Sequence, residues 1–183
     1  MSRGVFYHAV TGRPMQPGQQ ILITPDTPNG VYTRVMEKMP AVQEIYAHPE
    51  NYNAEELEHH TRVALRELAL EKVRVQHFKR YPSRMHCLYV SESLAEAEKW
   101  AGLFAERGRP TFSVVRLELN GEAFTGDAWN CFQASVSERE NLEMAERYWL
   151  NLPNMHGEAP IRETLISGEI TVAEIVREIN KNC

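Results

Sequence analysis

Residues 82–100 read Pro-Ser-Arg-Met-His-Cys-Leu-Tyr-Val-Ser-Glu-Ser-Leu-Ala-Glu-Ala-Glu-Lys-Trp, and this stretch predicts a turn, a short strand and a helix in succession. Pro82 ends the helical segment before it, because its ring disfavours helical geometry in the preceding residue. Residues 85–90 are apolar and compatible with a strand. Ser93 and Glu96 have capping-box spacing, which predicts a helix start. Apolar residues then recur at helical spacing: Leu94, Ala97, Ala101 and Phe104.

Three side chains of this stretch could serve a common cleft. Arg84 precedes the predicted strand, Tyr89 lies on it, and Trp100 lies on the following helix. The same residues also fit a plain strand–helix unit with an aromatic core. Both interpretations stay open at this point.

Composition indicates a soluble, intracellular protein. The chain has 183 residues, 43% of them hydrophobic and 25% charged, which are ordinary values for one globular domain over residues 1–183. A net charge of −5 argues against a general polyanion-binding surface. Cys87, Cys131 and Cys183 are an odd number without metal-ligand spacing, so we expect reduced thiols and no bound metal. We find no signal segment and no membrane-length apolar run, so we expect a cytoplasmic protein without membrane contact.

The N-terminal half predicts two strands and two helical segments. Residues 4–10 and 19–23 are predicted strands. Residues 24–53 contain four prolines and little periodicity, which predicts a long loop, with one short helix over 31–39, that acts as a lid or substrate loop. Residues 54–78 predict a helix capped by Asn53.

The C-terminal half predicts further strands and helices. We expect a strand over 111–119, a hairpin turn at Asn120 and Gly121, and a loop over 126–130. Ser137 precedes a helix over 138–150, in which Tyr148 and Trp149 are expected in the core. An irregular loop, a strand over 161–166, a turn at Ser167 and Gly168, a short strand and a final helix ending near 179 follow. This order predicts the α+β class.

Common catalytic motifs are absent from the sequence. It contains no phosphate-binding glycine loop, HExxH, CxxC or nucleophile elbow. Cys87 and Cys131 coexist with seven histidines, but nothing in the sequence pairs them for hydrolysis. Carboxylate-pair hydrolysis is equally undetermined, since any 25 acidic residues supply pairs.

Three separated pieces are more informative together. They are Tyr7-His8 at the end of the first strand, Arg84…Tyr89…Trp100, and Glu163 with Gly168 five residues later. Together they resemble the His-Tyr-Glu branch of the ADP-ribosyltransferase superfamily, whose members have an aromatic residue eleven positions after the strand tyrosine, as in Tyr89 and Trp100. The layout also resembles a small uncharacterised bacterial family with "PSR…CLYV", "YW" and "E…G" landmarks.

The sequence departs from the branch at three places. Cys87 stands where the eukaryotic ADP-ribose polymerases of this branch commonly have glycine. Trp100 stands where the branch usually has tyrosine. Residues 24–53 match no part of the resemblance.

The resemblance implies an ADP-ribosyltransferase-like split antiparallel β-sandwich with flanking helices, and NAD as the substrate between two small sheets. It implies that His8 contacts the adenosine ribose, that Tyr89 and Trp100 sandwich the nicotinamide, and that Arg84 holds the pyrophosphate. Glu163 would stabilise the positive charge that forms when the glycosidic bond opens. His8, Tyr89 and Glu163 would be catalytic.

The implied function is transfer of ADP-ribose to a macromolecule, either protein, RNA or DNA. A toxin or phage-defence role, with an antitoxin partner, is a further implication. An RNA 2′-phosphotransferase-like enzyme and a non-catalytic NAD-binding module are the alternatives. Each candidate residue also has a structural interpretation, and Glu158 or Glu169 could be the carboxylate in place of Glu163.

Overall fold

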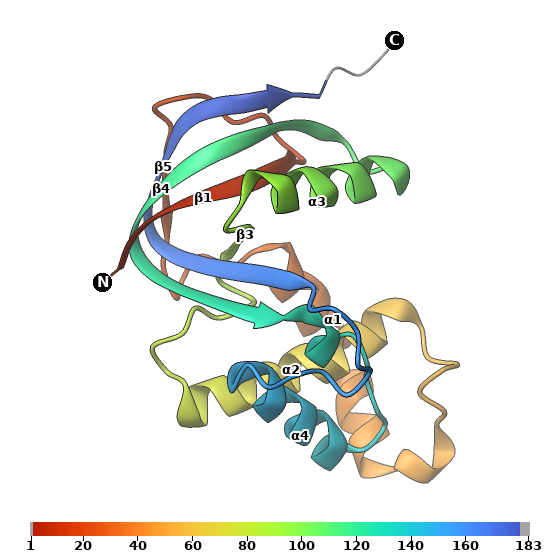
Figure 1. Cartoon of the computed structure of the whole chain (residues 1–183). Helices are drawn as coiled ribbons and strands as arrows, with labels where there is room; N and C mark the ends of the chain where they lie inside the picture. The colour runs from red at the N-terminus through yellow and green to blue at the C-terminus, as the bar shows by residue number, and fades with distance from the viewer. Residues whose placement is uncertain (1, 180–183) are drawn as a thin grey trace. The chain divides into compact units, whose positions relative to one another are not determined.

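The computed structural model describes residues 2–179, which form two compact units built from segments distant in the sequence (Figure 1). The β unit contains residues 2–24, 88–124 and 163–179. The helical unit contains residues 25–87 and 125–162. The single-domain organisation expected for residues 1–183 stays a prediction.

Strands make up most of the β unit. In the described part of the chain they are β1 (Ser2–Thr11), β2 (Gln20–Ile23), β3 (Leu88–Val90), β4 (Thr111–Asp127) and β5 (Arg162–Glu178). The strands predicted at 4–10 and 19–23 are confirmed. The strand predicted at 85–90 is shorter than expected, because only residues 88–90 pair with a neighbour.

The strands form one antiparallel sheet that closes on itself. The order is β1-β4-β5-β2, and β3 pairs with β5 beside β2. Tyr7 on β1 and Ser91, next to β3, exchange both backbone hydrogen bonds, at 2.9 and 2.8 Å. Strands β1, β4, β5 and β3 therefore form a closed circuit, and the α+β class with an antiparallel sheet is confirmed.

The core of the β unit follows from strand alternation, because every second side chain of a strand faces the same side. Phe6 pairs with Leu117, and the side chains two positions along each strand share that face. The buried members of this cluster are Phe6, Val10, Val90, Val115, Leu117, Leu119, Ile166, Ile170 and Val172.

The two predicted turns at Asn120-Gly121 and Ser167-Gly168 are wrong, because β4 and β5 run through them as continuous strands. Figure 1 shows both strands bending strongly along their length. A Cβ atom on Gly121 would overlap the carbonyl oxygen of Ser167, and one on Gly168 would lie 2.7 Å from the Asn120 oxygen. Gly168 also has φ +120°, which side chains disfavour. The two glycines allow the bent strands β4 and β5 to approach closely. The same residue pairs, Asn-Gly and Ser-Gly, are also common in turns, which is why the sequence predicted turns here.

The final helix predicted to end near 179 is also wrong. Strand β5 continues to Glu178, and its Ile170 and Thr171 pair with Ile21 and Gln20 of β2. Ile170 and Val172 enter the core on alternate positions. β-branched residues favour this extended, half-buried arrangement.

Helix α3 (Leu94–Glu106) packs on the outer face of β1. Ser93 Oγ accepts a hydrogen bond from the Glu96 amide at 3.2 Å, so the predicted cap is confirmed. The cluster beneath the helix contains Ala9, Ala97, Ala101 and Val114, with Tyr7 and Trp100 packed against it.

The helical unit contains α1 (Gly30–Ala47), η1 (Pro49–Asn51), α2 (His59–His77), η2 (Ala128–Cys131) and α4 (Glu138–Trp149). Helix α2 packs against both α1 and α4. Ser137 caps α4 as predicted, and Tyr148 and Trp149 are fully buried, as expected of core residues.

The long loop predicted over residues 24–53 is wrong, because residues 30–47 form α1. Asn29 caps this helix, and its side-chain oxygen accepts from the Val31 amide at 2.9 Å. Helix α1 buries Val35, Val42 and Ile45 against the rest of the helical unit. The short helix predicted over 31–39 is therefore part of α1, and Pro40, which favours a helix end, does not end it. Packing of an apolar face outweighs the lost backbone hydrogen bond.

Helix α2 begins later than predicted. Glu58, not Asn53, is its cap, and its carboxylate accepts from the amides of His60 and Thr61 at 2.9 and 3.1 Å. The residues between Asn53 and Glu58 form turns.

Cys87 and Cys131 are buried thiols that donate to the carbonyl oxygens of Arg84 and Ala128, at 3.5 and 3.2 Å, whereas Cys183 lies outside the described residues. Within residues 2–179, no helix has the length and apolar character needed to cross a membrane.

The crossing of β4 and β5 predicts the effect of adding one methyl group. Gly121→Ala should lower the free energy of unfolding by about 2–3 kcal/mol, because the new Cβ has no room beside Ser167. Gly102→Ala is the matched control: Gly102 lies on α3 with nothing near its Cβ position, so stability should rise by about 0.5–1 kcal/mol. Urea unfolding measures both. Equal effects of the two substitutions would contradict the close approach.

Candidate functional site

Three of the predicted site residues come together around β3. Tyr89 is the middle residue of this strand, His8 follows the Tyr7 that bonds to Ser91, and Glu163 lies near the start of β5. Strand β5 pairs Leu165 with Tyr89 and Thr164 with Val90, so Glu163 continues the strand one residue beyond the last pair. The fold therefore gathers three segments that are far apart in sequence.

Tyr89 and Glu163 lie on the same face of the sheet. Tyr89 pairs with Leu165, and Glu163 is two residues from Leu165, so side-chain alternation gives all three one face. Diagonal neighbours on adjacent strands are about 7–8 Å apart, within reach of a tyrosine and a glutamate. Both side chains are half-buried. An aromatic ring and a carboxylate thus share one face of the sheet.

Trp100 lies on the helix that covers the same side of β1. Its indole packs against the cluster containing Tyr7, whose pairing with Ser91 places Tyr7 on the face of Tyr89. The indole stacks on Phe104, with ring centroids 5.8 Å apart. It is half-buried, so one part of the ring is accessible.

His8 lies on the opposite face, with Phe6 and Val10. Its Nδ1 lies 2.7 Å from the carbonyl oxygen of Tyr89. A carbonyl oxygen can only accept a hydrogen bond, so Nδ1 carries the proton. In the neutral ring, Nε2 then has a lone pair that can accept a hydrogen bond. The geometry gives His8 a direct role in holding β3 in place.

The electrostatic surroundings favour the neutral form of His8. Burial of the ring lowers the pKa of His8 below its usual value. The hydrogen bond to Tyr89 opposes this shift, and the positive charge of Arg109 adds to it. His8 is therefore a neutral donor to the Tyr89 backbone near neutral pH.

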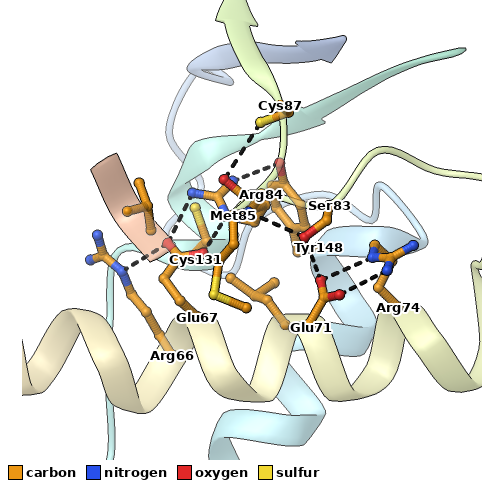
Figure 2. Close-up of polar contacts among 12 residues, drawn as sticks. Arg66, Glu67, Glu71, Arg74, Ser83, Arg84, Met85, Cys87, Cys131 and Tyr148 are labelled. Carbon is orange, nitrogen blue, oxygen red and sulfur yellow. Dashed lines mark hydrogen bonds and ion pairs between the residues drawn. The ribbon is translucent and has the colours of Figure 1, made fainter. Parts of the chain in front are cut away.

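Arg84 belongs to the helical unit, and its environment differs from the expected one. The side chain is 5% exposed, and Nε and Nη2 donate to the two carboxylate oxygens of Glu67 at 2.8 and 3.1 Å. Nη1 donates to the Tyr148 hydroxyl at 2.8 Å. Figure 2 shows the three side chains together. This geometry favours a structural role for Arg84 over the expected contact with a pyrophosphate.

The turn that carries Arg84 is also fixed on its other side. Ser83 Oγ donates to Glu71 at 2.8 Å, and Glu71 forms a two-point ion pair with Arg74 (Figure 2). Burial alone would raise the pKa of Glu71, but hydrogen bonds from Arg74 and Ser83 outweigh it and lower the pKa. Asn29 donates to the Arg84 carbonyl at 2.8 Å. Two carboxylates on one face of α2 thus anchor the residues leading into β3.

Sequence reasoning missed the partners of these residues. Glu67 is one of five acids in the helix predicted over residues 54–78, and only its burial beside Arg84 distinguishes it. Arg109 lies between Gly108 and Pro110, a pattern that predicts the end of a helix and gives the arginine no functional role. Over residues 2–179, no group of three or more His, Cys, Asp or Glu side chains has the arrangement of a metal site.

The buried ion pair predicts a large stability effect. Arg84→Met should cost about 3 kcal/mol of unfolding free energy, because the buried Glu67 would lose both hydrogen bonds from Arg84 and keep the longer, 3.7 Å contact with Arg66. Combining it with Glu67→Met should recover much of this loss. Arg139→Met is the control, since Arg139 and Glu143 form an exposed pair, and it should change stability little. A small effect of Arg84→Met in urea unfolding would contradict the structural role.

The lowered pKa of His8 predicts a pH dependence. The unfolded chain binds a proton at His8 at higher pH than the folded protein, so stability should fall as pH drops from about 7.5 to about 5.5. His8→Asn keeps a donor near Nδ1 but cannot titrate, so it should reduce this slope. Part of the slope should remain in His8→Asn, because burial also lowers the pKa of His59. Urea unfolding across this pH range measures the slope. A slope equal to that of the wild type would contradict the assignment.

No curated protein is similar enough to the chain to count as a match. A family model described as "Protein of unknown function (DUF2441)" matches residues 6–178, a segment that contains His8, Arg84, Tyr89, Trp100 and Glu163. The match covers nearly the whole chain, and the chain therefore belongs to the DUF2441 family.

Proposed function

We propose that this protein is an NAD-dependent ADP-ribosyltransferase that modifies a macromolecule. The observation that supports the proposal is the shared face of Tyr89 and Glu163, next to the helix that carries Trp100. Nothing in the sequence order requires residues 89 and 163 to be neighbours, yet the pairing of β3 with β5 makes them so.

The chemistry suits these side chains. A nicotinamide ring in NAD carries a positive charge, and electron-rich aromatic faces such as those of Tyr89 and Trp100 attract flat cations. The bond between the ribose C1′ and the nicotinamide nitrogen breaks, and its electron pair leaves with the nicotinamide. The ribose then carries positive charge, which the Glu163 carboxylate stabilises. A nucleophilic O–H or N–H of the acceptor adds to C1′ and loses its proton.

His8 acts through the backbone in this proposal. By donating to the Tyr89 carbonyl it fixes the short strand that carries the tyrosine. The resemblance implies a ribose contact for His8, but its ring lies on the face opposite to Tyr89 and Glu163, so the proposal gives His8 a positioning role instead.

The acceptor, protein or nucleic acid, is the least defined part of the proposal. The net charge of −5 mildly favours a protein. A toxin or phage-defence role, an antitoxin partner and a cytoplasmic location rest on the resemblance alone. An RNA 2′-phosphotransferase would need several arginines at the site, and the burial of Arg84 removes the strongest candidate. A non-catalytic NAD-binding module remains the alternative that experiment must separate.

Nicotinamide release on incubation with NAD tests the function. The wild type should release nicotinamide, and Glu163→Gln should lower the rate on the order of 100-fold or more, because the charge that stabilises the transition state is lost. Glu169→Gln and Glu158→Gln are matched controls, since both carboxylates are exposed, and they should keep activity.

Each other outcome has a defined meaning. Loss of activity in Glu169→Gln or Glu158→Gln, but not in Glu163→Gln, would move the catalytic role to that carboxylate. NAD binding without nicotinamide release, with or without candidate acceptors from a lysate, would favour the binding module. Absence of both binding and release would contradict the proposal.

A further inference from the structure

Arg109 occupies a fixed position just after α3. The Gly108 amide donates to the Ala105 oxygen and the Arg109 amide to the Phe104 oxygen, both at 2.9 Å. With Gly108 at φ +70°, this is a Schellman motif, a common way to end a helix. Pro110 restricts Arg109 further, and the Thr111 hydroxyl donates to its carbonyl at 3.0 Å. The backbone of Arg109 is therefore held in one conformation.

The guanidinium of Arg109 is exposed and lies over an aromatic ring. Its Cζ is 4.8 Å from the centroid of Phe104, which stacks on Trp100 at 5.8 Å. Trp100, Phe104 and Arg109 thus form a continuous row along α3. Within residues 2–179, no carboxylate pairs with this guanidinium and no hydrogen bond is formed by it.

Arg109 also acts on the candidate site. Its charge contributes to the lowered pKa of His8, so the two side chains are close enough to interact electrostatically. The row therefore links the proposed nicotinamide contact, Trp100, to a positively charged side chain in the same unit.

We propose that Arg109 binds the pyrophosphate of NAD. The inference rests on the proposed function and assigns a residue to the part of the substrate that Arg84 cannot reach from its buried ion pair. Guanidinium groups bind phosphate through two parallel N–H donors. In NAD one ribose joins the nicotinamide to the pyrophosphate, so a dinucleotide with its nicotinamide on Trp100 carries its phosphates close to that ring. Arg109 then contacts the phosphates while Trp100 and Tyr89 contact the base.

Arg109 also has a structural interpretation, in which it only helps to end helix α3. The Schellman motif suggests a variant that separates this role from phosphate binding. Schellman motifs commonly contain an apolar contact between the positions that Arg109 and Phe104 occupy. Arg109→Met keeps an unbranched side chain over Phe104 and removes the charge. A purely structural role is therefore preserved in Arg109→Met, whereas phosphate binding is lost.

The experiment measures binding by calorimetry with three probes: NAD, ADP-ribose and nicotinamide. Arg109→Met should weaken the binding of NAD and of ADP-ribose at least tenfold and leave the binding of nicotinamide unchanged, because only the first two probes carry the pyrophosphate. Arg109→Lys should lose less affinity for NAD and ADP-ribose than Arg109→Met does, because lysine keeps the positive charge. Arg107→Met, an exposed neighbour at the end of α3, should bind all three probes like the wild type. The thermal midpoints of the variants should agree within a few degrees.

Failure of this inference differs from failure of the proposed function. If the wild type binds NAD and Arg109→Met binds it equally well, Arg109 does not contact the pyrophosphate, and the proposed function stands. If the wild type does not bind NAD, the proposed function fails, and inorganic pyrophosphate then tests Arg109 alone. Pyrophosphate binding that is lost in Arg109→Met supports an anion site there, and absence of pyrophosphate binding overturns it.

Discussion

The buried ion pair between Arg84 and Glu67 is the interaction on which the rest of the structure depends. Two charges removed from water are tolerated only when each is fully compensated. Here two guanidinium nitrogens reach both carboxylate oxygens, and Tyr148 takes a third donor. Because the requirement is strict, it fixes the turn at residues 82–87, which leads directly into β3.

The position of β3 determines what the β unit can offer a ligand. Through its pairing with β5 and the bridge to Tyr7, this short strand joins the two ends of the strand circuit. It thereby places Tyr89 on the face of Glu163 and next to the helix that carries Trp100. His8 secures the arrangement from the other face by a hydrogen bond to the Tyr89 carbonyl. The candidate site is thus a product of strand pairing more than of any local motif.

The long bent strands complete this arrangement. At Gly121 and Gly168 the backbones of β4 and β5 touch, because neither residue has a side chain. The bend lets β5 pair with β2 along one half and with β3 along the other. An aromatic and charged row on α3, ending at Arg109, lies on the side of β1 that the helix covers. Together these features give the β unit the aromatic, acidic and basic groups on which the proposed function rests.

The sequence by itself determined the features that depend on neighbours in the chain. The caps at Ser93 and Ser137, the first two strands and the buried pair Tyr148-Trp149 follow from local hydrogen bonds and apolar spacing, and all were predicted. Tertiary structure alone decided whether Asn120-Gly121 and Ser167-Gly168 are turns or bends, because a glycine permits both and the partner strand selects one. It also decided that the helix predicted over 31–39 continues through Pro40 to residue 47, because burial of one apolar face outweighs a local penalty. The role of Arg84 was decided in the same way, since a charged side chain is a ligand contact or a structural ion pair according to the carboxylate that the fold brings beside it.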